Sequence, residues 1–502
     1  MKKIISIIAA AALTLSCFSC SEDKKKKEKT EEKPVNIEDG VKEPALDEPV
    51  KTEYKEFSED SFNTIEVNLN VTDKEPPLTM HQLNTSQIDF GSVIPPCKAE
   101  KYRDRYRTDK SDYEDEEYQK FIREKWEKSC TEPQKGDIYC SCIDGNTFYI
   151  EVEYDNNCLG HHESAIFRVD GLTGEKEEVF RHSDPENSLI IWQLYSVNGV
   201  LYVLTREKGL YYLDEEKKEL VNILEAEESQ KYSAYVMGNS AGRLLIRESI
   251  NHTEDVPKDY KTESGQYTYS DDGENYYIIT GCDVKVKEYD FGSKTWKELY
   301  SAFADYDPSV YGSISASKEC PFIYGELFAW KEKPENSRKY DVCTESYKVS
   351  TGLTGCDILY ASDKKLVLRQ GSKASSSETS FVHVFDLESS THYIIDYSGL
   401  GADNCKYAKD GIVVYPSVGS GKVYYIMPEI GLTFDLASFD STYDEYALDM
   451  WLSLYDSYDN SLWFDINIKR DEREVTEQPG VIYKEYDYDQ VKVWFTQEEN
   501  NE

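Results

Sequence analysis

The sequence has no apolar run long enough to cross a bilayer as a helix. Its longest run, Ile4–Leu15, has about twelve residues, whereas a membrane-spanning helix needs about 20. Hydrophobic residues make up only 39% of the 502 residues, which excludes a protein with many membrane spans. Positive charge is also scarce, because 57 Lys and Arg stand against 96 Asp and Glu, a net charge of −39. Such an excess repels phosphate backbones, so we expect no nucleic-acid partner.

Several signatures of catalysis are missing as well. The sequence contains no Gly-rich phosphate loop, no nucleophile elbow and no His-Glu-x-x-His motif, so these enzyme classes have no support. We expect no cofactor, and no motif supports Ca²⁺, although acidic loops could bind it. Aromatic residues, in contrast, are abundant, with 40 Tyr, 18 Phe and 7 Trp. This content excludes disorder over the whole chain.

The N-terminus has the pattern of an export signal. Lys2 and Lys3 form a positive segment ahead of Ile4–Leu15, which is the length of a signal-peptide core. Small residues before Cys17 and Cys20 resemble the lipobox of bacterial lipoproteins, although neither cysteine has Leu three positions upstream. The resemblance implies cleavage by a type II signal peptidase and a lipid anchor on Cys20, with Cys17 as the alternative. Lipidation of Cys20 leaves an even number of cysteines, which exported proteins tend to pair.

The resemblance also predicts a location and a domain organisation. It places the protein in the bacterial cell envelope, on the outer membrane, with exposure at the cell surface left open; an ordinary secreted protein is the alternative. Residues 1–19 are then the signal peptide. Residues 20–60, rich in Lys, Glu, Asp and Pro, are expected to be a disordered tether. Residues 61–135 are expected to form an extension with one strand near Ile65–Val71 and one helix over 111–129.

A strand that ends in Asp, followed by a polar turn and a second strand, recurs at a spacing on the order of 50 residues. Tight-turn dipeptides such as Asn198-Gly199 precede most copies. The residues are Asp170, Asp214, Asp290, Asp341, Asp386, Asp435 and Asp487, of which Asp341 is the weakest copy. Each unit reads as a four-stranded antiparallel blade in which the Asp carboxylate accepts backbone N–H groups at the turn.

The repeat therefore predicts an all-β fold, a seven-bladed β-propeller over residues 136–497, or six blades without the Asp341 copy. It resembles the kelch and quinoprotein-type repeat propellers, without matching one family closely. A pair of β-sandwiches is the alternative. The last blade contains four strand candidates of its own, so we expect the ring to close without exchange of strands between the termini. One strand of the extension is expected to cover an outer edge.

The cysteines allow two interpretations. In an oxidising compartment, disulfides or buried thiols are the simplest expectation, and the pairs Cys97–Cys130 and Cys343–Cys356 have suitable positions. Alternatively, a metal ion such as zinc could be held by a nearby set of thiolate and imidazole ligands. That set is Cys140, Cys142, Cys158 and His161.

One segment combines aromatic rings with carboxylates, the residue types that proteins use to hold sugars. Its candidate ligand-binding residues are Tyr443, Tyr446, Trp451, Tyr455 and Asp456. A buried strand with an acidic edge explains the same pattern. The sequence thus favours a monomeric, non-catalytic envelope protein that binds a glycan or a protein. The competing hypothesis is a carbohydrate-active propeller enzyme, a glycoside hydrolase or a lyase, and no catalytic residue is identified.

Overall fold

The computed structural model describes a chain built almost entirely of β-strands. The described residues are 54–93, 120, 124, 133–154, 163–183, 189–205, 209–224, 232–240, 242–258, 260, 268–270, 275–305, 321–334, 337–370, 380–416, 421–439, 451–454, 461–478 and 481–497. Two compact units are present, Met1–Lys51 and Thr52–Glu502, and the described residues belong to the second. Among them, no helix has the length and apolar character needed to cross a membrane.

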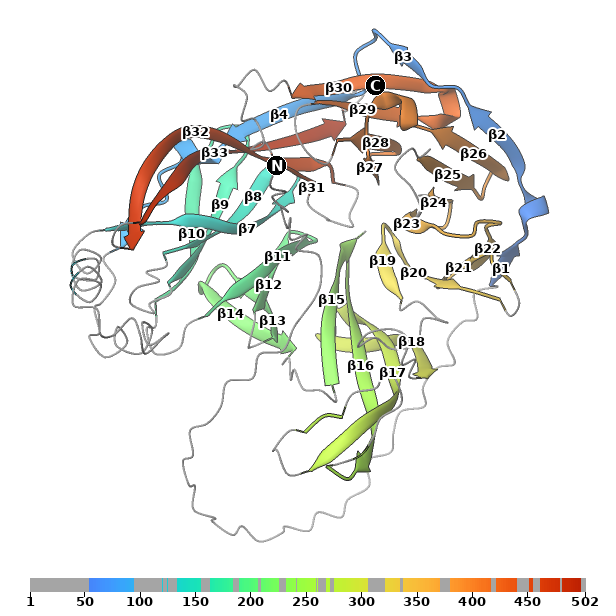
Figure 1. Cartoon of the computed structure of the whole chain (residues 1–502), viewed down its shortest axis with the longest axis horizontal. Coiled ribbons are helices and arrows are strands. Elements are labelled where there is room, and N and C mark those ends of the chain that lie inside the picture. The colour runs from blue at the N-terminus through green and yellow to red at the C-terminus, as the bar shows by residue number, and fades with distance from the viewer. Residues whose placement is uncertain are drawn as a thin grey trace, which may run out of the picture. The chain divides into compact units, whose positions relative to one another are not determined.

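Seven small sheets form a ring, which is a seven-bladed β-propeller (Figure 1). The predicted fold and the preferred blade number are therefore confirmed. In each blade the first strand in sequence lies at one edge of the sheet. From blade 1 to blade 6 these first strands are in contact with one another in order, so they are the innermost strands.

The blades follow one another in chain order. Blade 1 contains β7 (Asp137–Asp144), β8 (Thr147–Glu153), β9 (Ser164–Asp170) and β10 (Lys176–His182). Blade 2 contains β11 (Ile191–Val197), β12 (Val200–Thr205), β13 (Gly209–Asp214) and β14 (Glu219–Leu224). Blade 3 contains β15 (Tyr232–Ser240), β16 (Arg243–Val256), β17 (Tyr276–Asp290) and β18 (Thr295–Asp305). Blade 4 contains β19 (Phe322–Tyr324), β20 (Leu327–Glu332), β21 (Asp341–Thr344) and β22 (Tyr347–Ser350).

The last three blades complete the ring. Blade 5 contains β23 (Asp357–Ala361), β24 (Lys365–Gln370), β25 (Phe381–Asp386) and β26 (Thr391–Asp396). Blade 6 contains β27 (Asn404–Ala408), β28 (Gly411–Tyr415), β29 (Gly421–Met427) and β30 (Leu432–Phe439). Blade 7 contains β31 (Trp451–Leu454), β32 (Trp463–Gln478) and β33 (Val481–Gln497). Short 3-10 turns are η1 (Glu59–Ser61), η2 (Thr85–Gln87), η4 (Ser398–Leu400) and η5 (Pro428–Ile430).

The segment before the ring forms a belt around the outer edges of four consecutive blades, blue in Figure 1. Its strands β1 (Lys55–Phe57), β2 (Asn63–Val67) and β3 (Asn70–Thr72) pair in parallel with β22, β26 and β30. The expected outer-edge strand is thus present, and it is divided into β2 and β3 on two blades. A further pair, β5 (Ser92–Val93) with β6 (Gln134–Lys135), precedes blade 1.

Ring closure differs from the prediction. The fourth strand of blade 7 is β4 (Leu78–Asn84), which pairs antiparallel with β33 along its whole length. The expectation that blade 7 is complete in itself is wrong, because its two C-terminal strand candidates are one continuous strand, β33. That strand, of 17 residues, pairs with β32, of 16 residues, so no fourth strand remains on the C-terminal side.

Seven hydrophobic clusters, one between each pair of neighbouring blades, make up the core. The cluster that contains Trp463 and Trp494 of blade 7 also contains Phe148 and Ile150 of blade 1, so the ring is closed by apolar packing. The other six clusters join the remaining neighbours in order. The belt contributes to four of these seams, with Phe62 buried between blades 4 and 5.

The repeated Asp has the expected role in part of the ring. The carboxylates of Asp170, Asp290 and Asp386 each accept two backbone N–H groups of the turn that leads to the outermost strand. Asp214 accepts one such bond, from the N–H of Lys217. These hydrogen bonds lower the pKa of the Asp170 and Asp290 carboxyls, because they favour the charged form.

At three positions the predicted repeat is wrong, because the Asp does not end a strand. Asp341 begins β21 and pairs with Lys348 at 2.9 Å, while Thr344 accepts the turn N–H groups of Ser346 and Tyr347. Two further copies lie inside strands, Asp435 in β30 and Asp487 in β33. Only Lys120 and Glu124 of the predicted helix are described, and both are helical. Lys120 Nζ lies 3.8 Å from Glu124 Oε1.

Candidate functional site

The two faces of the ring differ in what they present. We call the face at which each innermost strand begins the entry face; in blade 1 it is marked by Asp137, Glu153 and Ser164, which are cross-strand neighbours. The ends of β16 and β32 and the beginnings of β17 and β33 lie on the same face, because antiparallel strands alternate in direction. These four strands have 14 to 17 residues, so two long hairpins belong to the entry face.

The innermost strands of several blades share a β-bulge near the entry face. The pairing register shifts by one residue at Tyr139 in β7, at Trp192 in β11 and at Leu359 in β23. Bulges add one residue and redirect its side chain, and they are common beside binding sites. Two of the three bulge residues are aromatic and exposed, Tyr139 at 50% and Trp192 at 45%.

These two residues belong to neighbouring innermost strands. Cys140 and Ile191, their direct neighbours in sequence, are buried in the same cluster between blades 1 and 2. The innermost strands β7 and β11 are also in contact with one another. Tyr139 and Trp192 therefore lie on neighbouring innermost strands, each next in sequence to a residue that is buried in the seam between blades 1 and 2. We call this pair the aromatic ledge.

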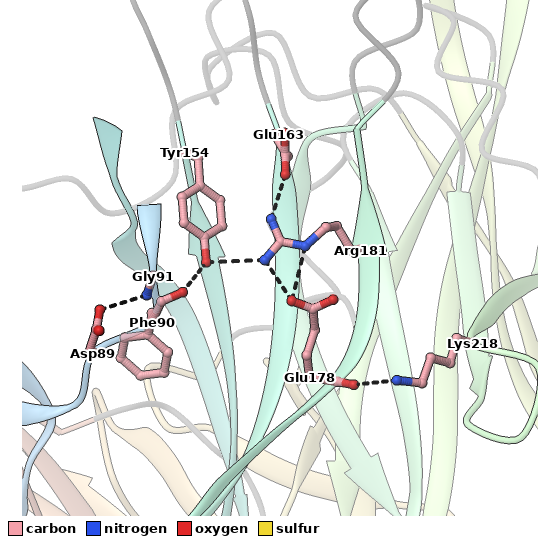
Figure 2. A network of polar contacts seen from close by, with 8 residues as sticks. All are labelled: Asp89, Phe90, Gly91, Tyr154, Glu163, Glu178, Arg181 and Lys218. Atoms are coloured by element: carbon pink, nitrogen blue, oxygen red, sulfur yellow. Dashed lines mark hydrogen bonds and ion pairs between the residues drawn. The ribbon is translucent and has the colours of Figure 1, made fainter. Parts of the chain in front are cut away.

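The outer part of blade 1 at the same face is closed by a polar network (Figure 2). Arg181 donates to Glu163 at 2.5 Å and to Glu178 at 2.6 Å, and a third bond reaches the Tyr154 hydroxyl at 3.5 Å. Tyr154 in turn donates to the backbone oxygen of Phe90 at 2.6 Å. These bonds hold the end of the belt against blade 1 and leave Arg181 fully engaged, so the network is structural.

The same network continues into blade 2. Lys218, in the turn between β13 and β14, donates to the backbone oxygen of Glu178 at 2.8 Å (Figure 2). Arg168 and Glu215 form a second bridge between the two blades at 2.6 Å. Blades 1 and 2 are thereby linked through residues of their outer strands and turns.

A buried cation joins blade 7 to blade 1. Lys492 is 2% exposed and donates to Ser141 Oγ and Asp465 Oδ1, each at 2.7 Å. Its ammonium also lies 5.0 Å from the centre of the Trp463 ring. Ser and Lys at this distance can form a catalytic dyad, but Ser141 is only 4% exposed, so no substrate reaches it. We assign the group to ring closure.

Glu151 is the most perturbed acidic group among the described residues. It lies on β8, opposite Cys140, and is 0% exposed. Neither carboxylate oxygen has a hydrogen-bond partner within the described part of the chain. Burial, reinforced by the charge of Glu153, raises the pKa of Glu151 to about 9. It is therefore protonated at neutral pH.

A chain of side chains crosses blade 5 to the belt. His383 bonds to Gln370 Oε1 at 2.9 Å and to His392 at 3.0 Å, and His392 lies 3.5 Å from the hydroxyl of Thr64 in β2. Burial lowers the pKa of both imidazoles to about 4, so both are neutral at pH 7. Their position under β2 indicates that they attach the belt.

The predicted cysteine sites are only partly described. Cys343 and Cys356 are buried free thiols in two different clusters, one between blades 3 and 4 and one between blades 4 and 5. The predicted bond between them is not seen; Cys343 lies on β21 of blade 4, and Cys356 directly precedes β23 of blade 5. Burial raises the pKa of Cys343 to about 12 and that of Cys356 to about 11. Cys97 and Cys130 lie outside the described residues, as do Cys17 and Cys20.

The proposed metal ligands do not form a site in the described part of the chain. Cys140 and Cys142 lie on β7, whereas Cys158 and His161 fall outside the described residues. No group of three or more His, Cys, Asp or Glu among the described residues could hold a metal ion. Cys140 is buried and its pKa is raised well above the usual value, which opposes a thiolate ligand.

The predicted sugar-binding segment also falls mainly outside the described part. Tyr443, Tyr446, Tyr455 and Asp456 lie there, and only the backbone of Trp451, the first residue of β31, is described. Neither residue of the aromatic ledge is predicted as a site residue from the sequence. Tyr139 and Trp192 each stand at the start of a strand that follows a polar segment, and only the bulge distinguishes them from core residues.

Comparison with known proteins identifies no family. No family model and no curated protein matches the chain. Among solved structures, it is similar to the acylaminoacyl peptidase of Pyrococcus horikoshii, with 11% identity, a TM-score of 0.42 and coverage of 70% of this chain and 52% of the peptidase. It is similar to the polysaccharide lyase Uly1 with 10% identity and a TM-score of 0.35, covering 71% of this chain and 89% of the lyase. The chain thus spans about half the length of the peptidase, and likeness at this level carries no functional argument.

Proposed function

We propose that this protein is a lipid-anchored propeller of the bacterial cell envelope that binds a glycan, without catalysis, on the entry face of its ring. The observation that carries the proposal is the aromatic ledge of Tyr139 and Trp192, exposed at 50% and 45%. Flat aromatic surfaces stack against the apolar face of sugar rings, and they lose little conformational entropy on binding. The lipobox-like sequence around Cys17 and Cys20 supports the anchor.

The rigidity of the surroundings supports binding further. The seam between blades 1 and 2 is tied by Arg168–Glu215 at 2.6 Å and by Lys218 to the backbone of Glu178 at 2.8 Å. A ligand that binds here therefore does not have to order the two blades first. Preorganised surfaces of this kind gain affinity because they avoid that entropic cost.

The test is a glycan panel screened for both binding and product release, with the full chain in detergent. The Tyr139→Ala/Trp192→Ala double variant is expected to lower affinity at least tenfold, equivalent to about 1.4 kcal/mol. Phe303→Ala is the matched control, because Phe303 is also 50% exposed but lies on β18, the outermost strand of blade 3. Equal loss in the control, or no glycan binding at all, would contradict the proposal and favour a protein partner.

One observation supports the competing hypothesis of a carbohydrate-active enzyme. Asp137 and Glu153 are direct cross-strand neighbours at the entry face, so their Cβ atoms are about 5 Å apart. Paired carboxylates are the machinery of glycosidases, and the pKa of Asp137 is raised by burial, as a general acid requires. Release of sugar by the wild type, abolished in Asp137→Asn and Glu153→Gln, would establish this alternative.

A further inference from the structure

The face of the ring at which the innermost strands end, which we call the exit face, carries acidic turns in three consecutive blades. Glu326 lies in the turn between β19 and β20, Asp363 in the turn between β23 and β24, and Asp410 in the turn between β27 and β28. All three residues are exposed. The strands that end there are neighbours, because β23 is in contact with both β19 and β27. The three carboxylates therefore form a row along one side of the exit face, which we call the acidic row.

Buried tyrosines lie beside the acidic row. The rings of Tyr360 and Tyr407 are in contact, with their centres 4.4 Å apart. The hydroxyl of Tyr360 donates to Oε1 of Glu326 at 3.0 Å, so blade 5 is bonded to the turn of blade 4. The hydroxyl of Tyr425 donates to the backbone oxygen of Lys409, in the turn between β27 and β28. Both hydroxyls thus bind groups of the exit-face turns.

The hydroxyl of Tyr407 differs from these two because it has no partner. The residue is 3% exposed, and its oxygen makes no hydrogen bond within the described part of the chain. Burial raises the pKa of this hydroxyl, and the negative charge of four carboxylates raises it further. These carboxylates, all in or directly before exit-face turns, are Asp410, Glu429, Glu326 and Asp386. The hydroxyl is therefore turned toward the exit face, and it is neutral at pH 7 and able both to accept and to donate.

The region around this hydroxyl has more negative than positive charge. Lys365 donates to Oε1 of Glu429 at 2.6 Å, and that ion pair neutralises one carboxylate. Arg243 reaches the backbone oxygen of the Glu326 turn at 3.2 Å, but its guanidinium is already paired with two carboxylates of blades 3 and 4. Asp363 and Asp410 form no ion pair or hydrogen bond with any other described residue. A positively charged ligand would offset their charge.

The available donors and acceptors select one class of cation. No group of three or more His, Cys, Asp or Glu among the described residues could hold a metal ion. A primary ammonium group, in contrast, has three N–H donors, forms charge-assisted hydrogen bonds with carboxylates and is attracted to aromatic rings. The neutral oxygen of Tyr407 can accept one of these donors. Because the carboxylates form a row, a molecule with two ammonium groups can use more than one of them.

We propose that the acidic row binds a linear diamine or polyamine, with one ammonium group bonded to Asp410 and to the hydroxyl of Tyr407 and another near Asp363. The hydroxyl is covered in this structure, so binding includes a shift of the side chains above it. The site is on the face opposite to the aromatic ledge, and the inference does not rest on the proposed glycan binding.

The experiment compares three divalent cations by calorimetry with the full chain in detergent. The first is 1,6-diaminohexane, and the second is hexamethonium, which has the same charge on the same methylene chain but no N–H donor. The third is Mg²⁺. We expect the diamine to bind about tenfold more tightly than either of the others, because only its ammonium groups can donate hydrogen bonds to the hydroxyl and the carboxylates.

Tyr407→Phe is the decisive variant, because it removes the hydroxyl and leaves the net charge unchanged. It should weaken binding of 1,6-diaminohexane about tenfold and change binding of hexamethonium less than about twofold. Without ligand, the variant should be at least as stable in urea as the wild type, because it lacks a buried hydroxyl without a partner. That measurement shows that a loss of affinity does not come from misfolding.

Two charge variants form a matched pair. Asp410→Asn should weaken binding of the diamine about tenfold, because it removes a carboxylate that contacts the ammonium. Glu175→Gln removes the same charge from an exposed residue at the exit face of blade 1, in the turn that leads into β10. It should change the affinity less than about twofold, because charges far from the ligand are screened.

Each remaining outcome overturns the proposal. Equal affinity for 1,6-diaminohexane and hexamethonium, or an affinity for the diamine that is unchanged in Tyr407→Phe, would exclude the hydroxyl from the site. Equal losses in Asp410→Asn and Glu175→Gln would show general attraction by the net charge of −39 instead of a site. Tighter binding of Mg²⁺ than of the diamine would refute the ligand class. None of these results bears on glycan binding at the entry face.

Discussion

The protonated Glu151 in the core predicts an unusual dependence of stability on pH. Its carboxyl pKa is about 9 in the folded protein and near 4.5 in the unfolded chain, because burial disfavours the charged form. Between these values the folded state holds a proton that the unfolded state has released. The contribution of Glu151 to the free energy of unfolding is therefore fully present below pH 4.5 and is lost as pH rises toward 9.

The magnitude follows from the shift. Each pH unit within the window costs about 1.4 kcal/mol, so the free energy of unfolding should fall by about 4 kcal/mol between pH 5 and pH 8 through Glu151 alone. Glu151→Gln keeps the shape and removes the ionisable proton. We expect the variant to be close to the wild type at pH 5 and more stable than it by about 4 kcal/mol at pH 8.

The assay is urea unfolding at pH 5, 6, 7 and 8, read as the difference between wild type and variant. The difference is used because two histidines also make the stability depend on pH. The pKa values of His383 and His392 are lowered to about 4, so their contribution to the free energy of unfolding rises with pH up to about pH 6.5, opposite to that of Glu151. Glu175→Gln is the control for loss of a surface carboxylate from the same blade. A difference between wild type and Glu151→Gln that stays constant across this pH range would refute the reasoning.

Three further substitutions test the ring. Phe62→Ala should lower the free energy of unfolding, measured in urea, by about 3 to 5 kcal/mol. Phe62 is 9% exposed, and the centre of its ring lies 5.1 Å from that of Phe385. A loss below about 1 kcal/mol would mean that the belt does not contribute to this seam. Asp386→Ala should lower the free energy of unfolding by about 1 kcal/mol. Asp386→Asn keeps an acceptor for the two turn N–H groups and should lower it less; equal losses would contradict the turn role. Lys492→Met should cost about 3 to 5 kcal/mol because Asp465 loses its partner, and the double variant with Asp465→Leu should recover part of it; no recovery would show that packing, not charge, is decisive.

The blade pattern could be predicted from the sequence because it depends on local signals. Asn198-Gly199 adopts the positive φ angles of 53° and 74° that a two-residue hairpin turn needs, and Asp170 bonds within its own turn. Such interactions span only a few residues, so their sequence signature is direct. In blade 4 the turn N–H groups bond to Thr344 and not to an Asp, so the sequence signature is lost there and the pattern points wrongly to Asp341.

Ring closure and the candidate site could not be predicted, because both depend on residues far apart in the chain. The sequence of β4 is that of an ordinary strand and does not indicate its partner. Because residues 481–497 form the single strand β33, blade 7 has a free outer edge, and β4 pairs with it. Likewise, Tyr139 becomes exposed through a one-residue shift in the pairing of β7 with β8, which no local pattern encodes. Glu151 is neutral because the fold buries it completely, and no local sequence pattern encodes that burial.

The belt has a consequence for the order in which the protein is made. Its strand β4 leaves the ribosome early, yet its partner β33 is among the last segments to be synthesised; Asn84 and Asp489, which bond across the two strands, are 405 residues apart. Until then β4 has an unpaired edge, and such edges promote aggregation. A chain that stops before Val481 therefore contains the strands of blades 1 to 6 but leaves β4 without its partner.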